Sequence, residues 1–159
     1  MNITVIAVGK IKEKFYTQAI EEYAKRLSRY CTLKTIEIPD EKAPENLSDA
    51  DMLSVIEKEG KRIIEKIPPS ATIISMEIEG KQISSIEFSK QIEEFAIRGQ
   101  SHLCFIIGGS LGLAEEIKKI SHLKLSFSKM TFPHQLFRVM LLEQIYRGFR
   151  IMKGQPYHK

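Results

Sequence analysis

Short apolar runs alternate with longer segments of helical periodicity along the whole chain, and this alternation constrains the fold most. A short apolar run that ends at a turn residue is typical of a buried strand, whereas apolar residues spaced three and four apart are typical of a helix. Predicted strands cover residues 2–8, 33–38, 72–76, 103–107 and about 123–126. Predicted helices cover residues 13–28, 49–66, 85–98, 114–120 and 133–153. This order predicts one three-layer α/β/α domain, residues 1–159, around a mainly parallel five-stranded sheet.

Local signals mark several of these boundaries. Ser48 is a predicted N-cap, and residues 84–87, Ser-Ser-Ile-Glu, fit a capping box. Glu79 and Gly80 indicate a turn after the third strand. The helix after Ser48 has five apolar residues predicted to face the core: Met52, Val55, Ile56, Ile63 and Ile64.

The charge of the chain is unevenly distributed. Six of the 24 Lys and Arg residues, but only one of the 20 Asp and Glu residues, lie from Lys129 onward. A basic segment of this kind favours a polyanionic partner such as nucleic acid. An alternative is a solvated helix face whose basic residues are favoured near the C-terminus by the helix dipole.

The two cysteines, Cys31 and Cys104, are far apart and show no CxxC spacing, so they predict neither a disulfide framework nor a zinc site. Buried, reduced thiols of a cytoplasmic protein are the simplest interpretation. We expect no secretory leader, because the N-terminus lacks a basic segment followed by an apolar core. No apolar run approaches the roughly 20 residues that a membrane helix needs.

The fourth predicted strand stops at a glycine-rich segment, residues 108–112, Gly-Gly-Ser-Leu-Gly. This segment is not a Walker loop, because no Gly-Lys-Ser/Thr follows, and it lies too late in the chain for a dinucleotide fingerprint. Parallel α/β folds bind ligands beyond the carboxyl ends of their strands. The segment is therefore a candidate binding loop, although a strand-to-helix turn that needs glycine torsions would look the same.

The segment of residues 126–132, Ser-Phe-Ser-Lys-Met-Thr-Phe, follows the fifth predicted strand at the same edge of the sheet. Its backbone, hydroxyl and large apolar groups suit a flat purine ring better than a phosphate. Pro133 is the predicted first residue of the last helix. Because that helix is apolar over more than one face, it predicts a homodimer, with a central core helix of a monomer as the alternative.

Polar residues in and after the last helix are candidates for the substrate side. His134 and Arg138 lie one helical turn apart and share a face. Tyr157 and His158 follow Gly154 and Pro156, so this tail could fold over a ligand, including one in a partner subunit. A capping histidine and a disordered chain end are the simpler alternatives.

The combined motifs resemble the large-subunit ribosomal RNA methyltransferase H family of the SPOUT superfamily. The motifs that carry the resemblance are residues 105–109 with Leu111 and Gly112, residues 125–135, residues 156–158, residues 8–10 with Tyr23 and Arg26, and residues 39–42. The resemblance implies a C-terminal trefoil knot and methyl transfer from S-adenosylmethionine to N3 of a pseudouridine in 23S ribosomal RNA of the assembled ribosome. It also implies a homodimer.

The resemblance further assigns residues. The cofactor contacts carry over to Met76, Gly108, Phe127, Ser128, Lys129, Met130, Thr131 and Phe132. The substrate side carries over to His134, Arg138, Tyr157 and His158, with His134 or His158 as the candidate base and no metal required. Arg138, Arg147 and Arg150 are expected to hold phosphates.

Three other functions remain as alternatives. One is a SPOUT methyltransferase acting on another RNA, such as a transfer RNA. Another is a non-catalytic RNA-binding dimer that uses only the basic C-terminal face. A nucleotide-dependent enzyme of the dinucleotide type is the weakest, because the first strand ends in Gly9-Lys10 only.

Overall fold

The computed structural model describes residues 1–159 and contains five parallel strands in the order β2-β1-β4-β3-β5. The strands are β1 (Asn2–Val8), β2 (Thr32–Ile38), β3 (Thr72–Gln82), β4 (His102–Ile107) and β5 (Leu123–Ser126). The helices are α1 (Lys14–Leu27), α2 (Asp49–Ile64), α3 (Ser85–Ile97), α4 (Glu115–Ile120) and α5 (His134–Met152). The predicted order of elements and the parallel sheet are confirmed.

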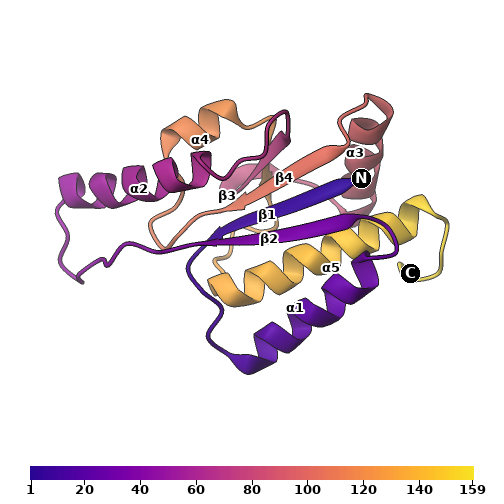
Figure 1. Ribbon diagram of the computed structural model, residues 1–159, viewed down its shortest axis with the longest axis horizontal. Helices are drawn as coiled ribbons and strands as arrows, with labels where there is room; N and C mark the ends of the chain where they lie inside the picture. Colours follow the sequence, from indigo (N-terminus) through magenta and orange to yellow (C-terminus); the bar gives the residue numbers. More distant parts are fainter.

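Helices cover both faces of the sheet, and the two faces carry separate apolar cores (Figure 1). Alternate side chains of a strand point to opposite faces. Ile3 and Val5 of β1 accordingly pack in the core beneath α1, α3 and α5, and Ile6 packs in the core beneath α2 and α4. Helix α5 packs against both α1 and α3. Its first turn lies at the carboxyl edge of the sheet (Figure 1).

Two capping boxes fix helix starts. Ser48 accepts a hydrogen bond from the backbone N–H of Asp51 at 3.2 Å, and Ser84 does the same for Glu87 at 3.2 Å. Both predicted caps are confirmed. Pro133, however, is the N-cap of α5 and not its first helical residue.

The predicted inner face of α2 is only partly correct. Ile63 is buried, but Met52, Val55, Ile56 and Ile64 are only partly covered, whereas Glu59 and Gly60 are buried. The reason is a close crossing with the chain before α4, because a Cβ at Gly60 would lie 2.7 Å from Cβ of Ala114. Periodicity gives the apolar stripe but cannot identify where a neighbouring segment crosses it.

Strand β3 extends beyond its predicted end and contains an irregularity that shapes the site. Both Met76 and Lys81 pair with Leu125 of β5, so residues 77–80 bulge out of the ladder. Gly80 is required there, because a Cβ would lie 2.7 Å from the backbone carbon of Leu125. The predicted turn at Glu79 and Gly80 is therefore wrong.

None of the five helices combines the length and the apolar character that crossing a bilayer would require. The two cysteines are free, with Cys104 buried and Cys31 partly buried. The threading of the C-terminal segment into a trefoil knot stays a prediction.

Candidate active site

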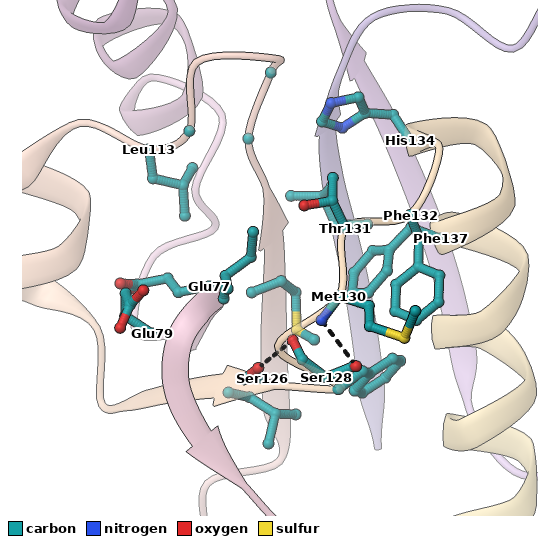
Figure 2. A pocket seen from close by; sticks show the side chains of 18 of the residues that line it. Glu77, Glu79, Leu113, Ser126, Ser128, Met130, Thr131, Phe132, His134 and Phe137 are labelled. Carbon is teal, nitrogen blue, oxygen red and sulfur yellow. Dashed lines mark hydrogen bonds between the residues drawn. The ribbon is translucent and has the colours of Figure 1, made fainter.

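A cleft of about 280 Å³ opens at the carboxyl edge of the sheet, where four segments meet (Figure 2). These segments are the bulge of β3, the glycine turn after β4 (residues 108–112), the loop after β5 (residues 126–132) and the first turn of α5. They are separated in sequence but share one edge, because every strand runs in the same direction.

The glycine turn forms one wall of the cleft. Gly112 has a φ of +90°, and its N–H donates to the carbonyl oxygen of Gly109 at 3.1 Å. A Cβ at Gly108 would lie 2.9 Å from the carbonyl carbon of Gly112. The turn needs glycines for its own folding, and without side chains it also leaves backbone accessible along the cleft.

A buried carboxylate supports the glycine turn from behind. Glu59 of α2 is 4% exposed, and its Oε1 accepts a hydrogen bond from the backbone N–H of Glu41 at 3.0 Å. Burial raises the pKa of Glu59. A Cβ at Gly109 would lie 2.7 Å from Oε2 of Glu59. Helix α2 and the segment after β2 therefore meet directly behind the wall of the cleft.

The loop after β5 is held in shape by its own hydroxyl groups and by aromatic packing. Ser126 Oγ donates to the carbonyl oxygen of Ser128 at 3.0 Å, and the N–H of Met130 donates to Ser128 Oγ at 3.0 Å (Figure 2). Phe127 and Phe132 pack on Phe137 of α5, with ring centroids 5.1 and 6.4 Å away. Met130 is 72% exposed and leaves an apolar side chain at the rim.

Seven of the eight predicted cofactor residues line this cleft: Met76, Gly108, Phe127, Ser128, Met130, Thr131 and Phe132. Lys129 is exposed and is not part of the lining. Sequence reasoning missed Glu77 and Glu79, which project from the bulge on the side opposite Phe132 and Phe137 (Figure 2). Glu77 accepts a hydrogen bond from Ser75 Oγ at 2.5 Å. The alternation of apolar and acidic residues after Met76 was the available signal.

The four predicted substrate-side residues do not come together within one chain. His134 lies at the rim of the cleft. Desolvation, followed by the charge of Arg138, lowers the pKa of His134, which favours a neutral imidazole at pH 7. Arg138 is 7% exposed and points inward, where it donates to the carbonyl oxygens of Val8 and Gly9 and pairs with Glu37 at 2.9 Å. Its side chain does not line the cleft.

The tail packs on the second half of α5, away from the cleft of its own chain. The ring of Tyr157 packs edge-on against Tyr146 at 5.0 Å, lies 4.7 Å from the guanidinium of Arg147, and its hydroxyl donates to Glu143 at 3.2 Å. Burial raises the pKa of Tyr157 to about 12. His158 Nδ1 lies 3.3 Å from Nη1 of Arg147. The tail therefore packs against α5 of its own chain.

Comparisons with known proteins give consistent results. A family model described as "Predicted SPOUT methyltransferase" matches residues 1–158. The chain is 60% identical to Ribosomal RNA large subunit methyltransferase H 1 of Clostridium perfringens and 57% identical to Ribosomal RNA large subunit methyltransferase H of Clostridium tetani, over 100% of each chain.

One solved structure supports the fold alone. A probable methylase family protein from Haemophilus influenzae superposes with a TM-score of 0.51 at 9% sequence identity, over 99% of this chain and 70% of that one.

Proposed function

Because the chain belongs to the SPOUT methyltransferase family, we propose that it methylates large-subunit ribosomal RNA with S-adenosylmethionine as the methyl donor. Its relatives named Ribosomal RNA large subunit methyltransferase H match it from end to end, and that name states the RNA on which they act. The observation that carries the proposal is the cleft, where a glycine turn, an aromatic loop and two carboxylates meet at the carboxyl edge of a parallel sheet.

The lining of the cleft fits this cofactor. Phe127 and Phe132, with the backbone around Ser128, suit a flat adenine, and Gly108 allows close approach to backbone. Glu77 and Glu79 carry charge opposite to that of a sulfonium and an ammonium group. When bound, the cofactor supplies a methyl group activated on positively charged sulfur. The chain therefore has to orient the acceptor and exclude water.

We propose N3 of a pseudouridine as the acceptor, in line with the family resemblance. The proton on that nitrogen has to leave, and a neutral imidazole within reach of the acceptor could take it. His134 is the preferred base, because it lies at the rim of the cleft and its pKa is lowered. His158 is the second candidate. Neither role needs a metal ion.

We further propose a homodimer in which the tail of one subunit reaches the cleft of the other. Support comes from a groove beside α5, lined by Val139, Met140, Glu143 and Gln144 together with Tyr23 of α1, Phe88 of α3 and Phe127 of the loop after β5. Tyr157 is bound to Glu143 at this groove and lies on the opposite half of α5 from the cleft of its own chain. A partner helix in the groove would bring each tail toward the other cleft.

Complementation between two defective chains tests this arrangement. One chain carries Gly108→Ala, which blocks the glycine turn, and the other lacks residues 157–159. If the tail acts on the partner's cleft, equal mixing before assembly restores roughly a quarter of wild-type activity, since half of the dimers contain one intact site of two. A tail that serves its own cleft would leave the mixture inactive.

The function itself is tested by methyl transfer from labelled S-adenosylmethionine. Intact ribosomes, protein-free ribosomal RNA and bulk transfer RNA from cells that lack the protein serve as substrates, and the modified nucleotide is mapped by mass spectrometry. We expect one methyl group on a large-subunit pseudouridine, with intact ribosomes preferred. Label in transfer RNA would show that the protein methylates another RNA. If calorimetry detected no binding of S-adenosylmethionine, the protein would be a non-catalytic RNA-binding protein.

A further inference from the structure

All three C-terminal arginines that the sequence offers for phosphate binding have hydrogen-bond partners within the protein. Arg138 is bound to Glu37 and to two carbonyl oxygens of the chain after β1. Arg147 pairs with Glu143 at 2.6 Å, and Arg150 donates to Tyr30 and to the carbonyl oxygen of Pro156. The charges of Arg138 and Arg147 are therefore paired within the chain, and unpaired basic residues closer to the cleft are the next candidates for RNA binding.

Three lysines that form no ion pair lie together at the start of the chain. Lys10, Lys12 and Lys14 are all exposed, within a segment that we call the lysine loop, residues 9–15. The first turn of α1 contains no acidic residue, and Lys14 opens the helix where the dipole disfavours a cation. Glu13 is the one acidic residue of the lysine loop, so the segment keeps a net positive charge. The helix dipole acts against Lys14, so stability of the fold does not explain the cluster.

The backbone of the lysine loop is held by side chains from two other elements. Oε1 of Gln135 accepts hydrogen bonds from the N–H groups of Lys12 at 2.8 Å and Glu13 at 3.1 Å. Glu37 of β2 accepts from the N–H of Ile11 at 3.0 Å, and Arg138 holds the carbonyl oxygen of Gly9. The loop thus has a defined position, although it belongs to no regular element before Lys14.

The same contacts fix the loop relative to the cleft. Gln135 and Arg138 lie in the first turns of α5, directly after His134 at the rim of the cleft. Strand β1 is the neighbour of β4, with Ala7 beside Ile107, so Gly9 and the glycine turn leave the sheet side by side. The segment between β1 and α1 passes beside the start of α5 (Figure 1).

An exposed aromatic ring completes this surface. Phe15 is 60% exposed, and its ring centroid lies 4.3 Å from that of Tyr16. A large apolar ring in water next to lysines serves no core, but it can stack on an unpaired base whose phosphates the lysines contact. Lysines alone would suit any anionic partner, whereas an aromatic platform among them favours single-stranded RNA over an acidic protein surface.

We propose that the lysine loop binds the RNA strand that flanks the target nucleotide, with Lys10, Lys12 and Lys14 on phosphates and Phe15 stacked on a neighbouring base. This proposal rests on the proposed function. It identifies the surface that would hold the RNA with its target nucleotide at the cleft. Gln135 and Arg138 then act as positioning residues, because they hold this surface at a fixed place beside the cleft.

The test compares two triple variants in methyl transfer to intact ribosomes across about 0.05 to 0.3 M KCl. The first carries Lys10→Ala, Lys12→Ala and Lys14→Ala. The control carries Lys58→Ala, Lys90→Ala and Lys119→Ala, which removes equal charge from exposed positions on α2, α3 and α4. Calorimetry with S-adenosylmethionine confirms that each variant is folded and binds the cofactor.

We expect the first variant to raise KM for ribosomes at least about tenfold, with kcat within about twofold of the wild-type value. The plot of log(kcat/KM) against log salt has a negative slope, and we expect this slope to become shallower by about 2. The control keeps the wild-type KM and slope. Phe15→Ala raises KM about tenfold but keeps the slope, because stacking releases no counterions.

Equal KM and slope in both triple variants would overturn the proposal. So would a defect on ribosomes that is absent in filter binding to protein-free ribosomal RNA, which would identify a ribosomal protein as the partner. If wild-type protein methylates no RNA, the proposed function fails, whereas the filter-binding comparison of the variants still tests the lysine loop.

Discussion

Nη2 of Arg138 donates a hydrogen bond of 2.6 Å to the carbonyl oxygen of Gly9, which joins the start of α5 to the end of β1. The same guanidinium reaches the carbonyl oxygen of Val8 at 3.0 Å and Glu37 at 2.9 Å. The sequence suggested a substrate-side arginine, but this geometry makes it the link between three elements at the carboxyl edge. A planar group with several donors suits this role, whereas a lysine would supply a single ammonium.

Arg138→Ala should lower the free energy of unfolding by about 3 kcal/mol, because it leaves buried carbonyl oxygens without a donor and removes the partner of Glu37. Arg98→Ala is the control, since that side chain is 67% exposed and its ion pair with Glu94 is long. The control should change stability by less than about 0.5 kcal/mol in urea unfolding. Similar small losses in both variants would exclude the linking role.

Gly109→Ala should weaken the binding of S-adenosylmethionine about tenfold, because the new Cβ would lie 2.7 Å from Oε2 of Glu59 and 3.2 Å from Cγ1 of Val8. Shortening Glu59 should relieve part of the strain. The double variant Gly109→Ala/Glu59→Ala is therefore expected to bind the cofactor better than the sum of the single effects predicts, as measured by calorimetry. If the effects of the two substitutions on cofactor binding simply add, the new Cβ at position 109 does not clash with Glu59.

His134 should titrate below its ordinary pKa of 6.5, since desolvation and Arg138 both disfavour the imidazolium. As pH falls through 6.5, the unfolded chain takes up this proton before the folded protein does. The folded protein is therefore most stable, as far as this group is concerned, above the pKa of the unfolded chain, and it loses this stability as the pH falls below that pKa. NMR titration of the ring gives the midpoint, and His134→Gln should flatten the loss of stability in this window.

If His134 is the base, its lowered pKa also determines the acid side of the pH–rate profile, where activity falls as the imidazole becomes protonated. The rate should fall only as pH drops through that value, and His134→Gln should remove the limb and about 100-fold of the turnover. An acid limb that survives in His134→Gln and disappears in His158→Gln would identify the tail histidine as the base.

Both thiols should resist modification in the folded protein. Burial raises the pKa of Cys31 to about 11 and that of Cys104 to about 12, so almost no thiolate exists near neutral pH. We expect Ellman's reagent at about pH 8 to react slowly with native protein and rapidly with both thiols in guanidinium. Fast reaction of the native protein would mean that one of these segments opens.

Much of the architecture could be predicted because strands, helices and their ends depend mainly on residues that are close in sequence. Apolar runs and helical spacing predicted every strand and helix in order, and Ser48 and Ser84 marked two helix starts. The glycine turn and the loop after β5 were located for the same reason. Each is a breaker or a loop composition that follows a strand, and parallel strands put such ends at one edge.

Tertiary structure alone decided which residues meet. The place of β4 between β1 and β3, the bulge that brings Glu77 and Glu79 into the cleft, and the inward course of Arg138 all depend on contacts between distant segments. Periodicity shows that a residue is covered or exposed but does not name its neighbour. Partner choice is set by pairing and packing over the whole chain, and that is why the lysine loop becomes a candidate RNA surface only after folding.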